Sequence, residues 1–330
     1  MAEKPHVSLI ATVLNEVDAI GELVSSLSRQ TVRDVEIVIV DGGSTDGTWE
    51  RLQQLASEDA RLRVFRDQSC NLKMCPGPIA RGRNRAIELA SAEVIACADA
   101  GCDYEPQWAA NLTAPILAGE ADYALGGSCI DPAQPDTTVW DIAAAPFLGL
   151  RLRTAGSARS ATGRSMAFRK SAWRKAGGFP EDTLMGEDTL FELRLRQVAT
   201  SAAPAGAMAR YRPRFSLRSA AARLGAYCAA DGALGIRRAK FVRNLLRCVA
   251  ELAALIALPW TAIPAFVMAA LEIYFAFERE ARSLFSRRFL KLVPARLIFS
   301  LAAPWIVTFN HLAGSLGCAH RANPQNLQEN

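Results

Sequence analysis

Hydrophobic and polar positions in the first hundred residues alternate between two periods. Apolar, β-branched runs of four to seven residues have the length of buried strands. Between them, apolar residues recur every three to four positions, which is helical spacing. The expected strands are 7–13, 35–40, 62–65 and 94–98, and the expected helices are 18–29, 45–56 and 78–91. This order predicts an α/β fold built on a doubly wound, mainly parallel sheet.

The pattern becomes mixed between about residues 105 and 200. Short strands are expected at 123–127 and 165–169, and a helix at 187–198, where apolar residues share one face. The Ala-rich stretch 199–209 has no clear period. We expect it to form a linker or an exposed loop.

The last third of the chain is more apolar. Residues 252–271 and 297–319 are runs of 20 and 23 residues without a formal charge. Each could cross a bilayer core of roughly 30 Å as a helix, or form a long buried helix. Basic residues flank both ends of the first run, so a single crossing would place one cluster on the wrong side. We predict a Pro-bent re-entrant hairpin or an interfacial helix for 246–277, and a crossing or interfacial segment for 297–319.

The net charge and the cysteine content restrict the possible cellular compartment and the possible classes of binding partner. The net charge of +5 does not require nucleic acid, and it suits anionic lipids or phosphates equally well. The eight cysteines are scattered without a Cys-x-x-Cys pair, which argues for reduced thiols and against zinc. We expect a cytosolic catalytic domain over 1–215 and a helical, membrane-associated region over 216–330.

Polar residues follow the first two predicted strands, at the edge where ligands of doubly wound sheets bind. Thr12, Asn15 and Glu16 end the first strand, and polar atoms there can contact a base or a ribose. Asp41 ends the second strand and opens the segment Asp-Gly-Gly-Ser-Thr-Asp-Gly-Thr. Its glycines permit a sharp turn and close approach of a ligand. The alternative is a capped turn that binds nothing.

Basic and acidic residues accompany the next helix and strand. Arg81 and Asn84 are three positions apart, so they share a helix face that could meet a phosphate or ribose, or simply face solvent. Asp99 ends the fourth predicted strand, where a buried carboxylate needs a partner. A divalent cation is one such partner, and a helix cap is the alternative.

Two adjacent acids begin the predicted helix at 187–198. Glu187 and Asp188 interact favourably with the positive end of the helix dipole, which is a sufficient structural reason for them. The alternative is catalytic. A carboxylate near a bound anionic donor has a raised proton affinity, which suits Asp188 to act as a general base.

Taken in order, these residues resemble the family 2 glycosyltransferases, which have the A-type glycosyltransferase (GT-A) fold. The resemblance covers about residues 6–215 and includes the Gly-Gly-Phe-Pro segment at 177–180. Tyr211-Arg212-Pro213-Arg214 looks like the Trp-x-Pro-Arg segment of a membrane-associated, exopolysaccharide-type subgroup. The family usually has Asp-x-Asp at the metal position, whereas this chain has Asp99-Ala100-Gly101 and lacks the second acid.

The resemblance implies a role for each motif. The base and ribose would be contacted by Thr12, Asn15, Glu16 and Asp41, and the nucleotide supported by Arg81 and Asn84. Asp99 would hold Mg²⁺ or Mn²⁺ on the diphosphate, and Arg212 and Arg214 would clamp that diphosphate. Asp188, beside Glu187, would deprotonate the acceptor hydroxyl.

The function implied is inverting transfer of a hexose from a UDP- or GDP-sugar to a lipid-linked or growing saccharide. Its setting would be exopolysaccharide or cell-envelope glycan synthesis at the cytoplasmic face of the inner or plasma membrane, with no nucleic-acid partner. One alternative is direct transfer onto polyprenyl phosphate, which needs little general-base help, so Asp188→Asn should largely spare it. The other is a non-catalytic membrane scaffold that retains the nucleotide-binding fold.

Overall fold

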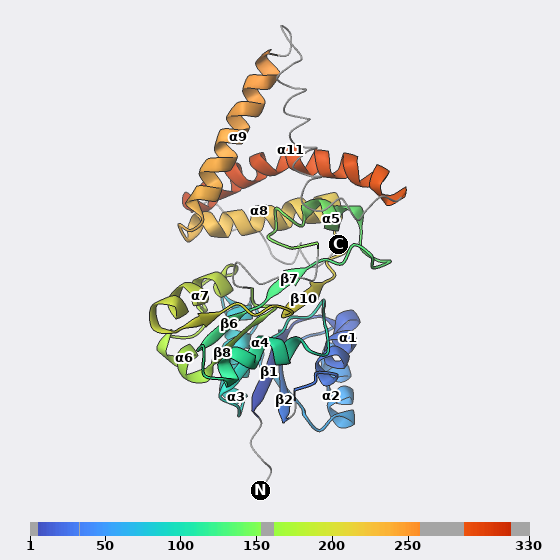
Figure 1. Cartoon of the computed structure of the whole chain (residues 1–330), viewed down its shortest axis with the longest axis vertical. Coiled ribbons are helices and arrows are strands. Elements are labelled where there is room, and N and C mark those ends of the chain that lie inside the picture. The colour runs from blue at the N-terminus through green and yellow to red at the C-terminus, as the bar shows by residue number, and fades with distance from the viewer. Residues whose placement is uncertain (1–5, 33, 153–161, 258–286, 318–330) are drawn as a thin grey trace. The chain divides into compact units, whose positions relative to one another are not determined.

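The structure of the chain is a computed structural model that describes residues 6–32, 34–152, 162–257 and 287–317 (Figure 1). The chain divides into two compact units, Met1–Asp131 with Arg153–Arg212 and Pro132–Leu152 with Pro213–Asn330. The second unit thus includes 132–152 in addition to the C-terminal third. The assignment of catalysis to 1–215 and of membrane association to 216–330 stays a prediction.

A seven-stranded sheet forms the centre of the first unit. Its strands are β1 (Val7–Val13), β2 (Val35–Asp41), β3 (Leu62–Arg66), β4 (Val94–Cys97), β6 (Tyr123–Leu125), β8 (Met166–Arg169) and β9 (Ser201–Ala202). They lie in the order β3-β2-β1-β4-β8-β6-β9. Neighbours are parallel except β8, which is antiparallel to both β4 and β6. The predicted α/β, mainly parallel sheet is confirmed.

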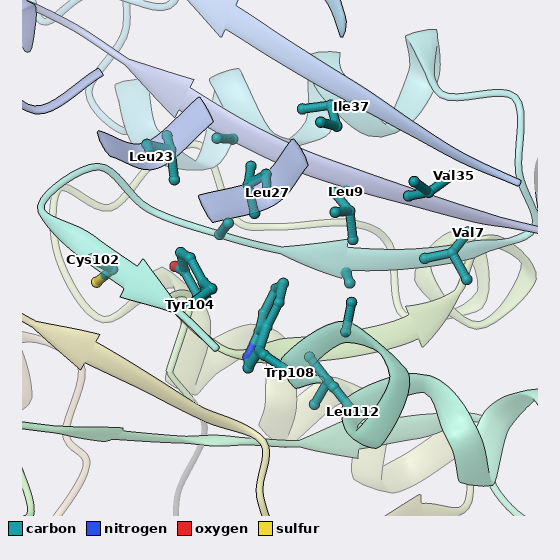
Figure 2. Close-up of a cluster of buried hydrophobic side chains, with 14 of the residues drawn as sticks. Val7, Leu9, Leu23, Leu27, Val35, Ile37, Cys102, Tyr104, Trp108 and Leu112 are labelled. Atoms are coloured by element: carbon teal, nitrogen blue, oxygen red, sulfur yellow. The ribbon is translucent and has the colours of Figure 1, made fainter. Parts of the chain in front are cut away.

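Helices cover both faces of this sheet because alternate strand residues are apolar on both sides. Leu9 and Ile37 pack with helices α1 (Val17–Ser28), α2 (Thr48–Glu58) and α4 (Trp108–Leu117). Figure 2 shows Leu23, Leu27 and Trp108 gathered over this face. On the other face, Ile10 and Val38 pack with α3 (Pro78–Leu89), α6 (Lys170–Lys175) and α7 (Glu187–Val198). Because β1, β2 and β4 are parallel and adjacent, their carboxyl ends share one edge.

A second sheet corrects one expectation from the sequence. Strands β5 (Cys102–Tyr104), β7 (Gly127–Cys129) and β10 (Met208–Tyr211) form it in the order β5-β10-β7. The prediction of a linker or exposed loop over 199–209 was therefore wrong for the strand residues 201–202 and 208–209, while 203–206 do form a loop outside the strands. Ala207 and Ala209 are fully buried, and β9 extends the main sheet. Small alanines have weak strand propensity, so burial between neighbouring elements decides this conformation.

The second unit is helical in its described part. It contains α5 (Val139–Ala144), α8 (Leu217–Ala233), α9 (Arg238–Ala257) and α11 (Arg287–Ser315), and α11 packs against the other three. The predicted apolar segment 246–277 is helical over 246–257, and 258–277 lie outside the described residues. Of 297–319, residues 297–315 are helical. Within the described ranges, Pro294–Ser315 alone is long and apolar enough to cross a membrane by length and composition.

Candidate active site

Asp41 lies at the end of β2 with its carboxylate fully buried. It accepts hydrogen bonds from the backbone N–H of Gly43 (3.1 Å) and of Ser44 (3.1 Å), and from the Ser44 hydroxyl. Arg66 Nε lies 3.4 Å from Asp41 Oδ2. In this structure the carboxylate thus braces its own turn. A contact with a nucleotide base stays a prediction.

The loops after β1 and β2 are held together by cross-loop hydrogen bonds. Asn15 donates from its backbone N–H to Ser44 Oγ (2.8 Å), and its side-chain oxygen accepts from the Thr45 N–H (2.9 Å). The Glu16 N–H donates to Thr48 Oγ1 (2.8 Å). The polar residues predicted to surround a nucleoside therefore meet at one sheet edge, as parallel strand ends require.

Thr12 links this edge to helix α3. A Cβ at position 82 would lie 2.0 Å from Thr12 Oγ1, so Gly82 is required for β1 and α3 to approach this closely. Arg81, one residue earlier, is 40% exposed and lies 3.7 Å from Glu181. It thus remains open to a solvent-borne ligand.

Asn84 is occupied within the protein. Its side-chain oxygen accepts from Trp173 Nε1 (3.0 Å) and the Phe179 N–H (2.9 Å). Its amide nitrogen donates to the Phe179 carbonyl (2.9 Å) and to Glu181 Oε1 (2.8 Å). Since all four hydrogen-bonding positions are filled, Asn84 shapes the loop around Phe179. Its predicted support of the nucleotide is untested.

The central residue of the site is Arg83, which the sequence analysis did not select. Its side chain is 3% exposed, and its two terminal nitrogens reach Asp99 Oδ1 (2.7 Å) and Glu187 Oε1 (2.6 Å). The guanidinium also lies over the Phe179 ring, 5.6 Å from its centroid. A Cβ at Gly163 would lie 2.2 Å from the guanidinium, so a glycine is needed there. Arg83 thereby joins carboxylates that are 88 positions apart in sequence.

This buried cluster is electrostatically strained. Burial lowers the pKa of Arg83, but the charges of Asp99 and Glu187 outweigh it, so the pKa is raised above its usual value. Burial and the neighbouring Asp188 charge raise the pKa of Glu187 even though Arg83 opposes them. One guanidinium therefore serves two acidic groups, and only a permanently charged arginine can do so with a fork of donors.

Asp99 is the candidate metal ligand. Its Oδ1 accepts from Arg83, no donor among the described residues reaches its Oδ2, and its side chain is 26% exposed. Its backbone N–H donates to the Tyr104 hydroxyl (2.9 Å), which fixes the turn. No group of three potential metal-ligating side chains occurs among the described residues. These residues fit an ion that is held by one carboxylate and by substrate phosphates, which is common for Mg²⁺.

Asp103 does not replace the missing second acid. It lies on β5, where its carboxylate is 3.6 Å from both Arg210 and Arg212 and 4.0 Å from Arg29. Arg212 also lies 3.0 Å from Glu22. The predicted diphosphate clamp is thus paired with carboxylates in this structure.

Arg214 belongs to the second unit. It lies 3.1 Å from Asp136 and is 67% exposed. Its φ of 49° places it in the left-handed region, which is unusual for a residue with a side chain. The proposal that it clamps a diphosphate therefore stays untested.

Asp188 lies in the first turn of α7. Its Oδ2 accepts from the Gly163 N–H (3.0 Å), and its Oδ1 accepts from the Thr189 N–H (2.6 Å). Gly163 therefore contacts both Arg83 and Asp188. The loop before β8 holds the candidate base in one orientation beside the Arg83 cluster.

The two cysteines on either side of Asp99 do not have the properties of a nucleophile or a metal ligand. Cys97 and Cys102 are buried, and burial raises the pKa of each thiol to about 12. Both are protonated near neutral pH, so neither is a nucleophile or a ready metal ligand.

A helical pattern could have revealed Arg83. Ala80, Arg83 and Ile87 share the buried face of α3 at spacings of three and four residues. An arginine on an apolar stripe needs buried carboxylate partners. The spacing of polar residues favoured Arg81 and Asn84 instead, and residue 83 lies between them in sequence.

Residues 8–177 match the family described as Glycosyl transferase family 2. The uncharacterized glycosyltransferase EpsJ of Bacillus subtilis is 35% identical over 100 residues, which are 30% of this chain and 27% of EpsJ. The Escherichia coli enzyme named UDP-Glc:alpha-D-GlcNAc-diphosphoundecaprenol beta-1,3-glucosyltransferase WfaP is 32% identical over 93 residues, 28% of this chain and 34% of WfaP. The matched segments thus span about a third or less of these relatives.

A solved structure has the same fold over nearly the whole chain. The mannosyltransferase PcManGT from Pyrobaculum calidifontis, in complex with GDP-Man and Mn²⁺, superposes with a TM-score of 0.56 at 18% identity. The match covers 98% of this chain and 89% of PcManGT. The predicted GT-A fold is confirmed.

Proposed function

This chain belongs to glycosyl transferase family 2, and we propose that it transfers a hexose from a UDP- or GDP-linked sugar to a lipid-linked or growing saccharide, with inversion. Membership of a family of glycosyltransferases favours an enzyme over the scaffold alternative. The observation that carries the assignment of the site is the contact of Arg83 with both Asp99 and Glu187. That contact brings the candidate metal carboxylate to the first turn of the helix that holds Asp188.

The proposed reaction is a single displacement. The acceptor hydroxyl oxygen forms a bond to the anomeric carbon on the face opposite the nucleotide diphosphate, and the bond from that carbon to the diphosphate oxygen breaks. Asp188 takes the hydroxyl proton. Two backbone N–H groups hold its carboxylate, which fixes the orientation a general base needs.

Arg83 acts in this scheme as a positioning residue. It holds one oxygen of Asp99, which leaves the other available to a metal ion, and it balances the charge of Glu187 beside the base. Since the guanidinium is buried and forked, it holds both carboxylates in a fixed geometry.

Asp99 would hold Mg²⁺ or Mn²⁺ together with the donor diphosphate. Such an ion neutralises the charge that develops on the leaving diphosphate. Arg212 would assist at the same phosphates by exchanging its contact with Glu22 for a phosphate oxygen. Arg81 is exposed enough for a similar contact. For Arg214, the predicted role as a diphosphate clamp rests on the sequence resemblance alone.

The loops after β1 and β2 would bind the nucleoside. Thr12, Asn15 and Glu16 lie beside the turn that Asp41 braces, at the sheet edge where doubly wound folds bind ligands. A base contact by Asp41 would require it to exchange a bond with its own turn for a bond to the ligand.

The acceptor and location follow from the relatives and the second unit. The name of WfaP specifies a diphosphoundecaprenol-linked acceptor, and a lipid-linked acceptor suits a chain with an apolar helical unit. We place the enzyme at the inner or plasma membrane, with its catalytic unit on the cytoplasmic side, in exopolysaccharide or envelope glycan synthesis.

The test is donor binding followed by turnover. The purified chain is heated with a panel of UDP- and GDP-sugars, with and without Mn²⁺. A donor at 100 times its Kd should stabilise the fold by about 2.7 kcal/mol. That donor should also be hydrolysed slowly, with release of nucleoside diphosphate. If no nucleotide sugar stabilises the chain or is hydrolysed, the proposed function is wrong.

A further inference from the structure

The polarity of helix α9 is reversed relative to a helix of a water-soluble protein. Its exposed side carries large apolar residues over nearly its whole length. These residues are Val242, Leu245, Leu246, Val249, Leu252, Leu255 and Ile256, with exposed fractions from 38% to 69%. Spacings of three and four residues place most of them along one stripe.

The buried side of α9 is polar instead. Asn244 and Glu251 are 7% and 8% exposed, and both lie on the side that faces α11. Glu251 accepts a hydrogen bond from Trp305 Nε1 (2.6 Å), and Cys248 Sγ lies 3.6 Å from Thr308 Oγ1. The two helices are thus joined by polar contacts.

Helix α11 is apolar on its exposed side as well. It buries Ser300, Thr308 and His311 together with the apolar residues Ala295, Phe299, Ala303 and Val307. Its outward residues are Ile298, Leu301, Phe309 and Leu312, with exposed fractions from 42% to 62%. The outer face of the pair is defined here by the exposed apolar residues of α9 and these four residues of α11.

Reversed polarity is unfavourable in water and favourable in lipid. Exposed apolar surface costs about 25 cal/mol per Å² in water, and a soluble protein rarely leaves such a contiguous patch uncovered. In a bilayer the hydrocarbon takes up this surface, while polar side chains pair between helices. The pattern of the α9–α11 pair is therefore that of a helix pair in contact with lipid.

Charge along α9 indicates how it would lie. The basic residues are confined to its first half and the segment just before it: Arg237, Arg238, Lys240, Arg243 and Arg247. From residue 248 to 257 the one charged residue is Glu251, which is buried against Trp305. Basic residues favour the anionic headgroup layer, and the end that exposes no charge favours hydrocarbon.

We propose that the outer face of α9 and α11 docks into a lipid bilayer with anionic headgroups, the C-terminal half of α9 entering the hydrocarbon. This surface specifies the membrane partner within the proposed function and rests on that proposal for its biological purpose. It uses none of the catalytic residues, so the two claims can fail separately.

The experiment is flotation of the full chain with vesicles. Vesicles of phosphatidylcholine with phosphatidylglycerol are compared with vesicles of phosphatidylcholine alone. The variant Leu246→Ser/Val249→Ser/Ile256→Ser should lower the fraction bound by at least about tenfold, because three exposed apolar contacts are lost. The matched control, Leu117→Ser/Leu193→Ser/Val198→Ser, changes three exposed apolar residues of the first unit and should bind as the unchanged chain does.

A charge variant tests the orientation. Arg238→Gln/Arg243→Gln should weaken binding to the anionic vesicles by roughly fivefold per residue and leave binding to neutral vesicles unchanged. Circular dichroism and donor-dependent heat stabilisation are recorded on every variant, so that loss of folding or of donor binding is seen separately.

Two results would overturn the proposal. The apolar triple variant could float as well as the unchanged chain. Alternatively, the unchanged chain could ignore vesicles and form a dimer in solution that the same variant dissociates, which would assign this surface to a second copy.

Discussion

A glutamate is buried at each end of the central sheet, and the pKa values of the two side chains are shifted in opposite directions. Glu36 is the second residue of β2 and lies at the amino end of the strands β1 and β2. Glu187 contacts Arg83 near the loops that follow the carboxyl ends of the strands. The pKa of Glu36 is lowered to about 2, whereas the pKa of Glu187 is raised. Burial acts on both, so the difference lies in the number of donors around each carboxylate.

Glu36 has a full set of donors. Its Oε1 accepts from Ser8 Oγ (2.6 Å), Ser91 N–H (2.5 Å) and Ser91 Oγ (2.6 Å), and Arg63 lies 2.7 Å from its Oε2. These bonds outweigh burial, which by itself would raise the pKa. The carboxylate thereby ties the starts of β1, β2 and β4 together.

Glu187 shares its one cation. Arg83 divides its guanidinium between Glu187 and Asp99, and Asp188 adds a second negative charge nearby. An arrangement that costs stability is expected where a group must interact with a ligand. The comparison separates an end of the sheet where a buried glutamate stabilises the fold from the end that carries the proposed site.

The largest effect is expected from Asp188→Asn at the chemical end. The amide keeps the shape of the carboxylate but cannot accept the hydroxyl proton, so kcat should fall by roughly 10²–10⁴-fold. The change is measured as glycosyl transfer to a saccharide acceptor at saturating donor. Heat stabilisation by the donor serves as the control and should persist.

The same variant distinguishes the two acceptor classes. A phosphate acceptor is already ionised and needs little help from a base. If Asp188→Asn transfers sugar to polyprenyl phosphate at near the unchanged rate, the acceptor is that phosphate and the hydroxyl mechanism is excluded.

Removing the shared cation should affect both folding and activity. Arg83→Met leaves the buried Glu187 and the partly buried Asp99 without their cation, which should lower the free energy of unfolding by about 3–5 kcal/mol. Arg83→Lys keeps the charge but not the forked geometry. It should recover most of the stability, measured by urea unfolding, while kcat stays low and donor KM changes less. Full kcat in Arg83→Lys would show that Arg83 supplies only charge.

Glu36→Gln, at the amino end of the sheet, should lower the free energy of unfolding and leave the catalytic rate unchanged. The folded pKa of about 2 lies below the ordinary 4.5, so the folded state favours the ionised form by roughly 3 kcal/mol. That stability is complete above pH 4.5 and disappears as the pH falls toward about 2. The variant should therefore unfold more easily by about 2–3 kcal/mol at pH 7, with kcat per folded molecule unchanged. Equal destabilisation at all pH values would contradict the role of the charge.

The sequence predicted this sheet better than it predicted the roles of its residues. Strand and helix periods along residues 7–98 are local, and they give the fold correctly because both sheet faces are buried. The prediction for 199–209 failed at its C-terminal end, because Ala207 and Ala209 carry no local strand signal and β10 forms between β5 and β7. Tertiary burial overrides propensity there.

The roles of the site residues stay predictions, and the structure shows which of these residues meet. The order of Asp99 and Glu187-Asp188 along the chain indicated a glycosyltransferase. Arg83 was not selected, because its value depends on partners 16 and 104 residues away that meet only in the folded chain. For Asn84, local spacing suggested a ligand contact, whereas in the structure its hydrogen bonds are made within the protein.

The smallest effect should come from an exposed acid near the chemical end, Glu22. It is 62% exposed and lies 3.0 Å from Arg212, and exposed ion pairs contribute about 0–1 kcal/mol. Glu22→Gln should leave stability nearly unchanged. If Arg212 clamps the diphosphate, the loss of a competing carboxylate should lower donor KM by about two- to fivefold at low salt, with kcat unchanged.

Salt and a matched variant make this last effect interpretable. The decrease in KM should shrink above about 0.5 M salt, since screening already weakens the exposed pair. Glu88→Gln, which removes a similarly exposed acid 3.1 Å from Arg85, should leave KM unchanged. A higher donor KM in Glu22→Gln would mean that Glu22 holds Arg212 ready for the donor rather than competing with it. In that case even an exposed carboxylate at this end of the sheet would serve the site, whereas the buried Glu36 serves only the fold.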